Sequence, residues 1–191
     1  MNGIKITEYQ SDWSDQFANL ASVIRSAIGT EAVRIDHIGS TSVPDLAAKD
    51  ILDVQITVSD LNQKSYLTKL QDAGFRLREH IVYDLLTGLK EGSIELRKRF
   101  LREIPGQRQA HIHVREQGRL NQIYPLLFRD YLKADAVVRA AYEVIKKELA
   151  EHFPDDADAY YRIKDPCMDT IYQGAKLWAE QCDWEPDDNF Q

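Results

Sequence analysis

A short turn rich in hydroxyl groups is the segment of this sequence best suited to chemistry. Gly39 allows the backbone to turn tightly and to approach a ligand closely. Three hydroxyl-bearing residues follow it, namely Ser40, Thr41 and Ser42. Hydroxyl groups and amides at such a turn can hold a phosphate group, although the same residues also form ordinary capping turns, which composition alone favours.

An aspartate lies in the strand that follows the turn. The β-branched residues and the alternation of 51–58 predict a strand whose even positions are buried and whose odd positions share the other face. A carboxylate in such a strand must be solvated, paired or bound to a metal, which draws attention to Asp53. Twelve residues separate it from Ser40. A Gly-Ser turn, about a dozen residues and a strand with Asp-hydrophobic-Asp resemble the signature of the nucleotidyltransferase fold.

The second acidic position of that signature is Gln55 in this chain. Nucleotidyl transfer normally uses two or three carboxylates to hold Mg²⁺. Gln55 can offer a carbonyl oxygen to a metal or hydrogen-bond a ligand, but it carries no charge. We expect Glu95 on a neighbouring strand to be a further metal ligand, with Asp36 and Asp50 as other candidates, although a surface glutamate is the simpler reading.

Two histidines lie on one face of a later predicted strand. His111 and His113 are two residues apart, so with Asp53 they could form a mixed metal site, or His113 could act as a general base. The alternative is that they hydrogen-bond within a polar cleft and bind nothing. His37 flanks the Gly-Ser turn, and we therefore expect three histidines to converge there.

Positive side chains are available to hold a phosphate group. The candidates are Lys49, Arg97, Arg99, Arg129 and Lys164, of which Arg99 and Lys164 are the preferred pair. A solvated surface charge is the simpler interpretation of any single one. The neighbouring tyrosines 160 and 161 could stack on a base or pack in a helix core.

Three stretches resemble the GrpB family. They are His-Ile-Gly-Ser-Thr-Ser-Val-Pro at 37–44 with Ile-Leu-Asp at 51–53, His-Ile-His-Val at 111–114, and Phe-Arg-Asp-Tyr-Leu at 128–132. Asp45 departs from the family, which usually has glycine there. The resemblance implies a nucleotidyltransferase-like domain with a helical C-terminal part, in a family whose reaction and substrate are poorly defined.

The elements that position these residues follow from periodicity and turn signals. We expect helices at 11–28 and 59–73, and strands at 4–8, 32–38, 51–58, 75–83, 93–102 and 109–116. After Gly118 the apolar spacing is helical. This predicts an α+β fold: a nucleotidyltransferase-like mixed β-sheet flanked by helices in 1–118, a helical C-terminal part in 119–182 packed on this core, and a mobile acidic tail in 183–191.

The bulk composition limits the partners. A chain of 191 residues with a net charge of -7 fits one domain and carries no broad cationic field for a long nucleic acid or an anionic membrane. Cys167 and Cys182 read as reduced thiols. The absence of an export signal predicts a cytoplasmic protein, and we expect a monomer or homodimer.

Three functions compete for these residues. The leading hypothesis is a metal-dependent nucleotidyltransferase or related phosphate-transfer enzyme that acts on a small molecule, with a nucleoside triphosphate as a possible substrate. In it, Gly39 and Ser40 hold phosphate and Asp53 binds Mg²⁺. The alternative is a noncatalytic module that binds a nucleotide or phosphate ligand on the same scaffold. A histidine-centred metal hydrolase ranks third.

Overall fold

A mixed five-stranded sheet forms the centre of the protein, whose computed structural model describes residues 3–187. The sheet order is β1-β2-β5-β4-β3, in which β2 and β5 are parallel and the other neighbours are antiparallel. The strands are β1 (Arg34–Ile38), β2 (Leu52–Val58), β3 (Arg76–Leu77), β4 (Lys98–Arg102) and β5 (Ala110–Glu116). The predicted α+β class, a mixed sheet flanked by helices, is confirmed.

One face of the sheet packs on the two helices of the first half. The even positions of β2 are buried there, as predicted, with Leu52, Val54 and Ile56 fully enclosed. The covering helices are α1 (Trp13–Ile28) and α2 (Ser65–Asp72). Their apolar stripes, spaced by three and four residues, face the strands and form the larger hydrophobic core. This face holds the fold together and leaves the opposite face for polar groups.

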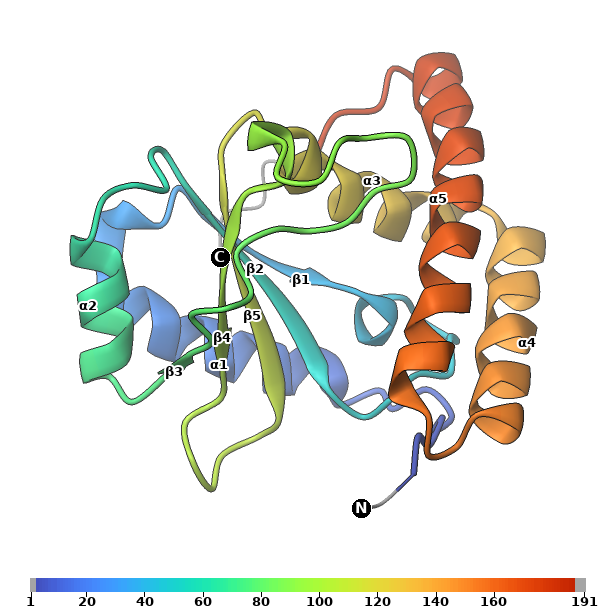
Figure 1. The fold of residues 1–191 in the computed structure, drawn as a ribbon, viewed down its shortest axis with the longest axis horizontal. Helices are drawn as coiled ribbons and strands as arrows, with labels where there is room; N and C mark the ends of the chain where they lie inside the picture. The colour runs from blue at the N-terminus through green and yellow to red at the C-terminus, as the bar shows by residue number, and fades with distance from the viewer. Residues whose placement is uncertain (1–2, 188–191) are drawn as a thin grey trace.

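Three helices complete the second half of the chain. They are α3 (Leu120–Ala134), α4 (Ala136–His152) and α5 (Ala157–Cys182), and they share a second core with Val43 and Leu46. Figure 1 shows α4 and α5 side by side, on the opposite side of the sheet from α2. None of the helices in residues 3–187 combines the length and the apolar composition that a membrane crossing requires.

Several predicted elements are shorter than the sequence suggested. The expected strand at 4–8 is reduced to a single bridge between Thr7 and Ala48, and 75–83 is reduced to β3 and a bridge at Tyr83. The predicted strand at 93–102 begins with a 3-10 helix, η3 (Ile94–Leu96), before β4. The helix expected from 59 begins later, because Asp60 accepts a hydrogen bond from the backbone of Asn62 and forms a turn.

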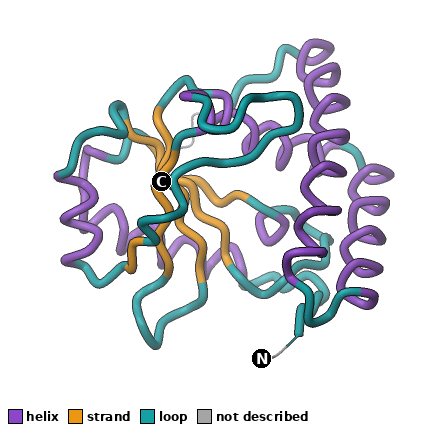
Figure 2. Tube along the Cα trace, in the orientation of Figure 1, coloured by secondary structure: helices purple, strands orange, loops and turns teal. Residues whose placement is uncertain are grey.

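A long loop connects β3 to η3 and crosses toward the C-terminal helices. Figure 2 shows this loop, residues 78–93, passing near the upper half of α5. The backbone N–H of Thr87 donates to a carboxylate oxygen of Asp169 on α5, at 2.9 Å. The loop therefore links the two halves of the chain above the polar face of the sheet.

The described part of the predicted mobile tail is packed against the fold. Trp184 contacts the second core, and its Nε1 donates to Asp130 at 3.2 Å. Mobility from Asp183 onward stays a prediction, and Trp184 is the large apolar side chain that places this part of the tail against the second core. Residues 188–191 lie outside the described residues.

Candidate functional site at the polar face of the sheet

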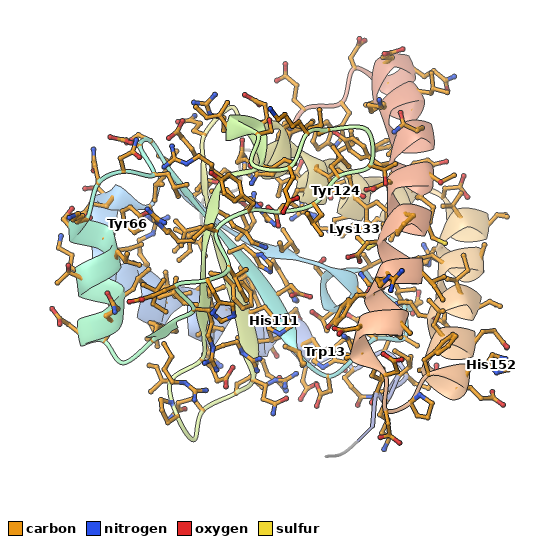
Figure 3. All side chains as sticks on the ribbon, in the orientation of Figure 1. Trp13, Tyr66, His111, Tyr124, Lys133 and His152 are labelled. Carbon is orange, nitrogen blue, oxygen red and sulfur yellow. The ribbon has the colours of Figure 1, made fainter. Side chains whose placement is uncertain are left out.

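A pocket of about 570 Å³ opens between the polar face of the sheet and the C-terminal helices. Both halves of the chain line it: β2, β4 and β5 form its floor, and α3, α4 and α5 contribute its wall. His111 on β5 and Tyr124 on α3, both labelled in Figure 3, are two of the lining residues. The pocket is thus the place where the candidate residues from distant parts of the sequence can meet.

The Gly-Ser turn meets Asp53 at the edge of this pocket. Gly39 has a φ of 70°, and a Cβ atom at this position would lie 2.8 Å from the Cβ of Asp53. Both the positive φ and the close approach require glycine. Ser40 and Thr41 line the pocket from the 3-10 helix η2 (Ser40–Ser42), whereas the Ser42 hydroxyl donates to the Gly39 carbonyl at 2.6 Å and does not line it.

Asp53, His111 and His113 form a compact cluster on the floor. The Nδ1 atom of His111 lies 3.1 Å from Oδ1 of Asp53, and the Nε2 atom of His113 lies 3.7 Å from the same oxygen. One potential metal-ligating atom from each residue falls within 4.8 Å of the others. The parallel register explains this, because Asp53 pairs with His111 on the same face of the sheet.

The charge states of this cluster follow from its surroundings. Burial opposes ionisation of Asp53, but hydrogen bonds from the two histidines hold the pKa of its carboxyl well below the usual range. Burial, assisted by Arg115 and Lys98, lowers the pKa of His113 to about 3, so its ring is neutral at pH 7. The cluster therefore combines a carboxylate with a neutral imidazole, which is the form in which both bind metals.

Arg115 fixes the tautomer of His113. Its guanidinium lies 3.3 Å from Nδ1 of His113, and because arginine has no acceptor, Nδ1 must accept the hydrogen bond. The ring proton of neutral His113 then resides on Nε2, which faces Asp53. A cation at this nitrogen would have to displace that proton while Arg115 holds Nδ1. His111 Nδ1 also donates to Asp53, but within residues 3–187 no hydrogen bond fixes its other ring nitrogen, so its proton can move there and leave Nδ1 and Asp53 as the more readily available ligands.

A buried ion network that the sequence did not reveal supports the floor. Asp84, from the loop at 78–93, pairs with Lys98 at 2.6 Å and with Arg115 at 2.9 Å. It also accepts from the side-chain amide of Asn121 at 2.9 Å. Burial opposes ionisation, but Arg115 and Lys98 hold the pKa of Asp84 well below its usual range. This second carboxylate on the floor of the pocket is therefore neutralised by two cations.

Gln55 lies on the same face of the sheet as Asp53 but does not line the pocket. It is fully buried, accepts from Arg115 at 2.7 Å and donates to the Gln122 carbonyl at 2.9 Å. The position that is acidic in the nucleotidyltransferase signature thus joins β2 to β5 and α3 here. Asp36 and Asp50 are also outside the pocket lining, and each is paired with an arginine.

His37 lies on the opposite face of the sheet from the histidine pair. Its ring stacks on Phe17 of α1 with centroids 4.6 Å apart, and Nε2 contacts the Thr41 hydroxyl at 3.0 Å. Burial lowers its pKa to about 4. Arg129 donates to the His37 carbonyl at 3.0 Å and does not line the pocket. The expected convergence of three histidines is therefore wrong. Side chains alternate between the two faces along β1, and His37 lies on the face that packs on α1.

Glu95 and Arg99 also lie away from Asp53. Glu95 pairs with Arg119 at 3.0 Å and accepts from the first backbone N–H of α3, which makes it a helix-capping residue. Arg99 occupies the opposite face of β4 and interacts with Tyr66 of the first half. The alternation of β4 instead directs Lys98 to the pocket. The prediction for Arg99 did not allow for which face of β4 is polar, and the prediction for Glu95 did not allow for the later start of this strand.

Three lysines from separate segments meet on the helical wall of the pocket, and we call them the lysine wall. Lys49 follows the turn, Lys146 lies on α4 and Lys164 lies on α5. Sequence reasoning found Lys49 and Lys164 but missed Lys146. The missed signal was its spacing, since Lys146 lies four residues after buried Tyr142 and therefore on the apolar stripe of α4.

Comparisons with known proteins give consistent similarities. The family model described as GrpB protein matches residues 3–174. A crystal structure of a conserved protein GrpB from Enterococcus faecalis superposes with a TM-score of 0.74 and 31% identity, covering 91% of this chain and 99% of that one. UPF0157 protein SCO7215 of Streptomyces coelicolor is 37% identical over 84% of this chain and 78% of its own length.

Longer relatives carry a different name. A dephospho-CoA kinase of Mycolicibacterium paratuberculosis is 32% identical over 96% of this chain but only 48% of its own length. The chain thus spans about half the length of this curated relative. The activity named for the longer protein does not pass to this chain through a match of that extent.

Proposed function

This chain belongs to the GrpB family, and we propose that it binds a small phosphorylated molecule of nucleotide size together with one divalent cation at Asp53. The observation that carries the proposal is the cluster of Asp53, His111 and His113 on the floor of a cationic pocket. Its volume of about 570 Å³ falls within the range of about 300–1,000 Å³ that is common for small-molecule sites. The Gly-Ser turn and strand aspartate, which resemble the nucleotidyltransferase signature, favour a nucleotide.

The donor set determines which cation fits. A pair of Mg²⁺ ions held by two or three carboxylates does not fit these residues, because Gln55 is neutral and buried and Asp84 is paired with two cations. One carboxylate oxygen with imidazole nitrogen suits Mn²⁺ or Zn²⁺ better than Mg²⁺. Asp53 and His111 would hold such an ion, which would attract a phosphate oxygen to the floor.

Nucleotidyl or phosphoryl transfer is the second candidate function. The specific feature that favours it is neutral His113, whose ring proton on Nε2 faces Asp53. A neutral imidazole with its proton on Nε2 can donate a hydrogen bond to the negative charge that develops on a phosphate oxygen during transfer. If the protein binds its ligand without turnover, the site is the noncatalytic binding module that the loss of the second carboxylate suggests.

Thermal unfolding in the presence of ligands tests the proposal. ATP, GTP, CTP and UTP are added singly with Mn²⁺, Zn²⁺ or Mg²⁺. A ligand at 100 times its Kd should raise the Tm by about 5–10 °C for a chain of this size. We expect the rise to require Mn²⁺ or Zn²⁺ and to disappear in Asp53→Asn.

The matched control is Asp72→Asn, an exposed aspartate on α2 beyond the other face of the sheet. It should retain the full rise in Tm. The proposal is refuted if no nucleotide shifts the Tm at saturating cation, or if Asp53→Asn and Asp72→Asn respond alike. His113→Gln separates the two candidates, because it should remove any turnover while it retains binding.

A further inference from the structure

Lys146 is a buried cation without a carboxylate partner. Its side chain is 2% exposed, and its ammonium group donates to the Ala47 carbonyl. The nearest acidic residue on its helix, Glu143, uses one oxygen for Lys147 and the other for the backbone N–H of Ala47. Within residues 3–187, no carboxylate lies within 4.0 Å of the Lys146 ammonium. A buried charge left in this way is costly unless something else neutralises it.

Tyrosine rings contact all three members of the lysine wall, and the Lys146 ammonium lies 4.9 Å from the ring centre of Tyr142. The Lys49 ammonium lies 4.9 Å from the ring centre of Tyr160 and 4.2 Å from that of Tyr161. The Lys164 ammonium lies 5.5 Å from the same Tyr161 ring. Lys164 has one carboxylate partner, Asp165, at 2.9 Å. Cation–π contacts orient these ammonium groups but leave their positive charge in place.

The lysine wall therefore carries a surplus of positive charge that the floor does not share. Three ammonium groups face two carboxylates on the wall, Asp165 and Asp169, and Asp169 accepts hydrogen bonds from the Thr87 backbone and the Tyr124 hydroxyl instead of pairing with a lysine. On the floor, Lys98 and Arg115 are balanced by Asp84 and Asp53. The chain as a whole is acidic, with a net charge of -7, so this local surplus is not part of a general cationic surface. An anion bound here would relieve the repulsion among the lysines.

We propose that the lysine wall is a subsite for a second anionic group of the same ligand, so that the ligand is a polyphosphate ester, such as a nucleoside di- or triphosphate, and not a monophosphate. One phosphate group would lie near the cation at Asp53, and the outer phosphates would contact Lys146 and Lys164. The nature of the ligand rests on the proposed function. The existence of an anion subsite does not, and it has a separate test.

Calorimetric titration with inorganic tripolyphosphate, without any divalent cation, tests the subsite alone. We expect saturable binding that Lys146→Met and Lys164→Met each weaken at least tenfold, whereas Asp53→Asn leaves it intact or tightens it. Lys176→Met, an exposed lysine of α5 outside the pocket lining, is the matched control and should bind like the wild type. Circular dichroism verifies that each variant is folded.

A second titration compares AMP with ATP in the presence of Mn²⁺. The wild type should prefer ATP at least tenfold, and Lys146→Met should reduce this preference without weakening AMP. Tripolyphosphate binding that depends on Lys146 while no nucleotide binds would support the subsite and refute the proposed function. No tripolyphosphate binding, or equal loss in Lys146→Met and Lys176→Met, would overturn the subsite.

Discussion

Replacement of Lys146 by methionine should stabilise this protein. Lys146 is 2% exposed, and burial lowers its pKa from 10.5 to about 7; repulsion from Lys164 and Lys147 adds to this shift, against the attraction of Glu143. Methionine has a similar length and carries no charge, so it fits the same space without the cost of desolvation. The methionine variant should therefore be more stable than the wild type and should bind anions more weakly.

The magnitude follows from the shift in pKa. The difference between 10.5 and about 7 is about 3.5 units, which at about 1.4 kcal/mol per unit gives an upper limit of about 5 kcal/mol. Loss of the hydrogen bond to the Ala47 carbonyl offsets about 1–3 kcal/mol of this gain in stability. We therefore expect Lys146→Met to raise the free energy of unfolding by about 2–4 kcal/mol at pH 6.5.

The sign of the pH dependence is specific to a depressed lysine pKa. Between about pH 7 and 10.5, the unfolded chain keeps this proton and the folded chain has lost it. Unfolding then takes up a proton, so the contribution of Lys146 to stability rises with pH through this window. The free-energy cost of burying charged Lys146 applies in full below about pH 7 and disappears above about pH 10.5. The advantage of the methionine variant should shrink accordingly as pH rises.

Urea unfolding of the wild type, Lys146→Met and Lys176→Met at pH 6.5, 8.0 and 9.5 measures this effect. The slope with urea should stay the same in all three proteins, because the surface exposed on unfolding is unchanged. A Lys146→Met protein less stable than the wild type at pH 6.5 would refute the reasoning. So would a gain that Lys176→Met shares, or one that does not decline with pH.

Three further variants probe the frame of the pocket. Gly39→Ala should lower the free energy of unfolding by about 2 kcal/mol or more in urea titration, since its φ is positive and the added methyl group meets Asp53; an unchanged midpoint would contradict this. Asp84→Asn should cost about 3–5 kcal/mol by the same measurement, because it leaves two buried cations unpaired, and a loss below 1 kcal/mol would mean that water already screens them. Trp184→Ala should cost about 1–3 kcal/mol in thermal unfolding, whereas a mobile tail would cost nothing.

Local pattern predicted the elements that carry the floor of the pocket. The alternation of 51–58 and 109–116 gave two strands, and the spacing of His111 and His113 placed both on one face. The structure brings both beside Asp53. This outcome depends on two facts: which positions of each strand share a face, and that β2 pairs with β5. Residues that are paired in register lie on the same face of a sheet.

The rest of the site depends on information that no local pattern holds. Asp84 lies in an irregular loop, so nothing in its neighbourhood predicted that it would reach Lys98 and Arg115. Glu95 and Arg99 were misplaced because the start of β4 and the face that it turns to the pocket depend on pairing with β5. The burial of Lys146 could have been predicted, because its helical spacing from Tyr142 places a charged side chain among buried neighbours.

The parallel pairing of β2 with β5 also bears on when the site can exist during synthesis. Asp53 and His111 are 58 residues apart in the chain, and the contact of Lys146 with Ala47 joins residues 99 apart. A nascent chain that leaves the ribosome from its N-terminus exposes the aspartate long before its imidazole partners. The helical wall emerges last. Ligand added to a stalled, partly made chain would therefore find a binding surface only after α5 has been released.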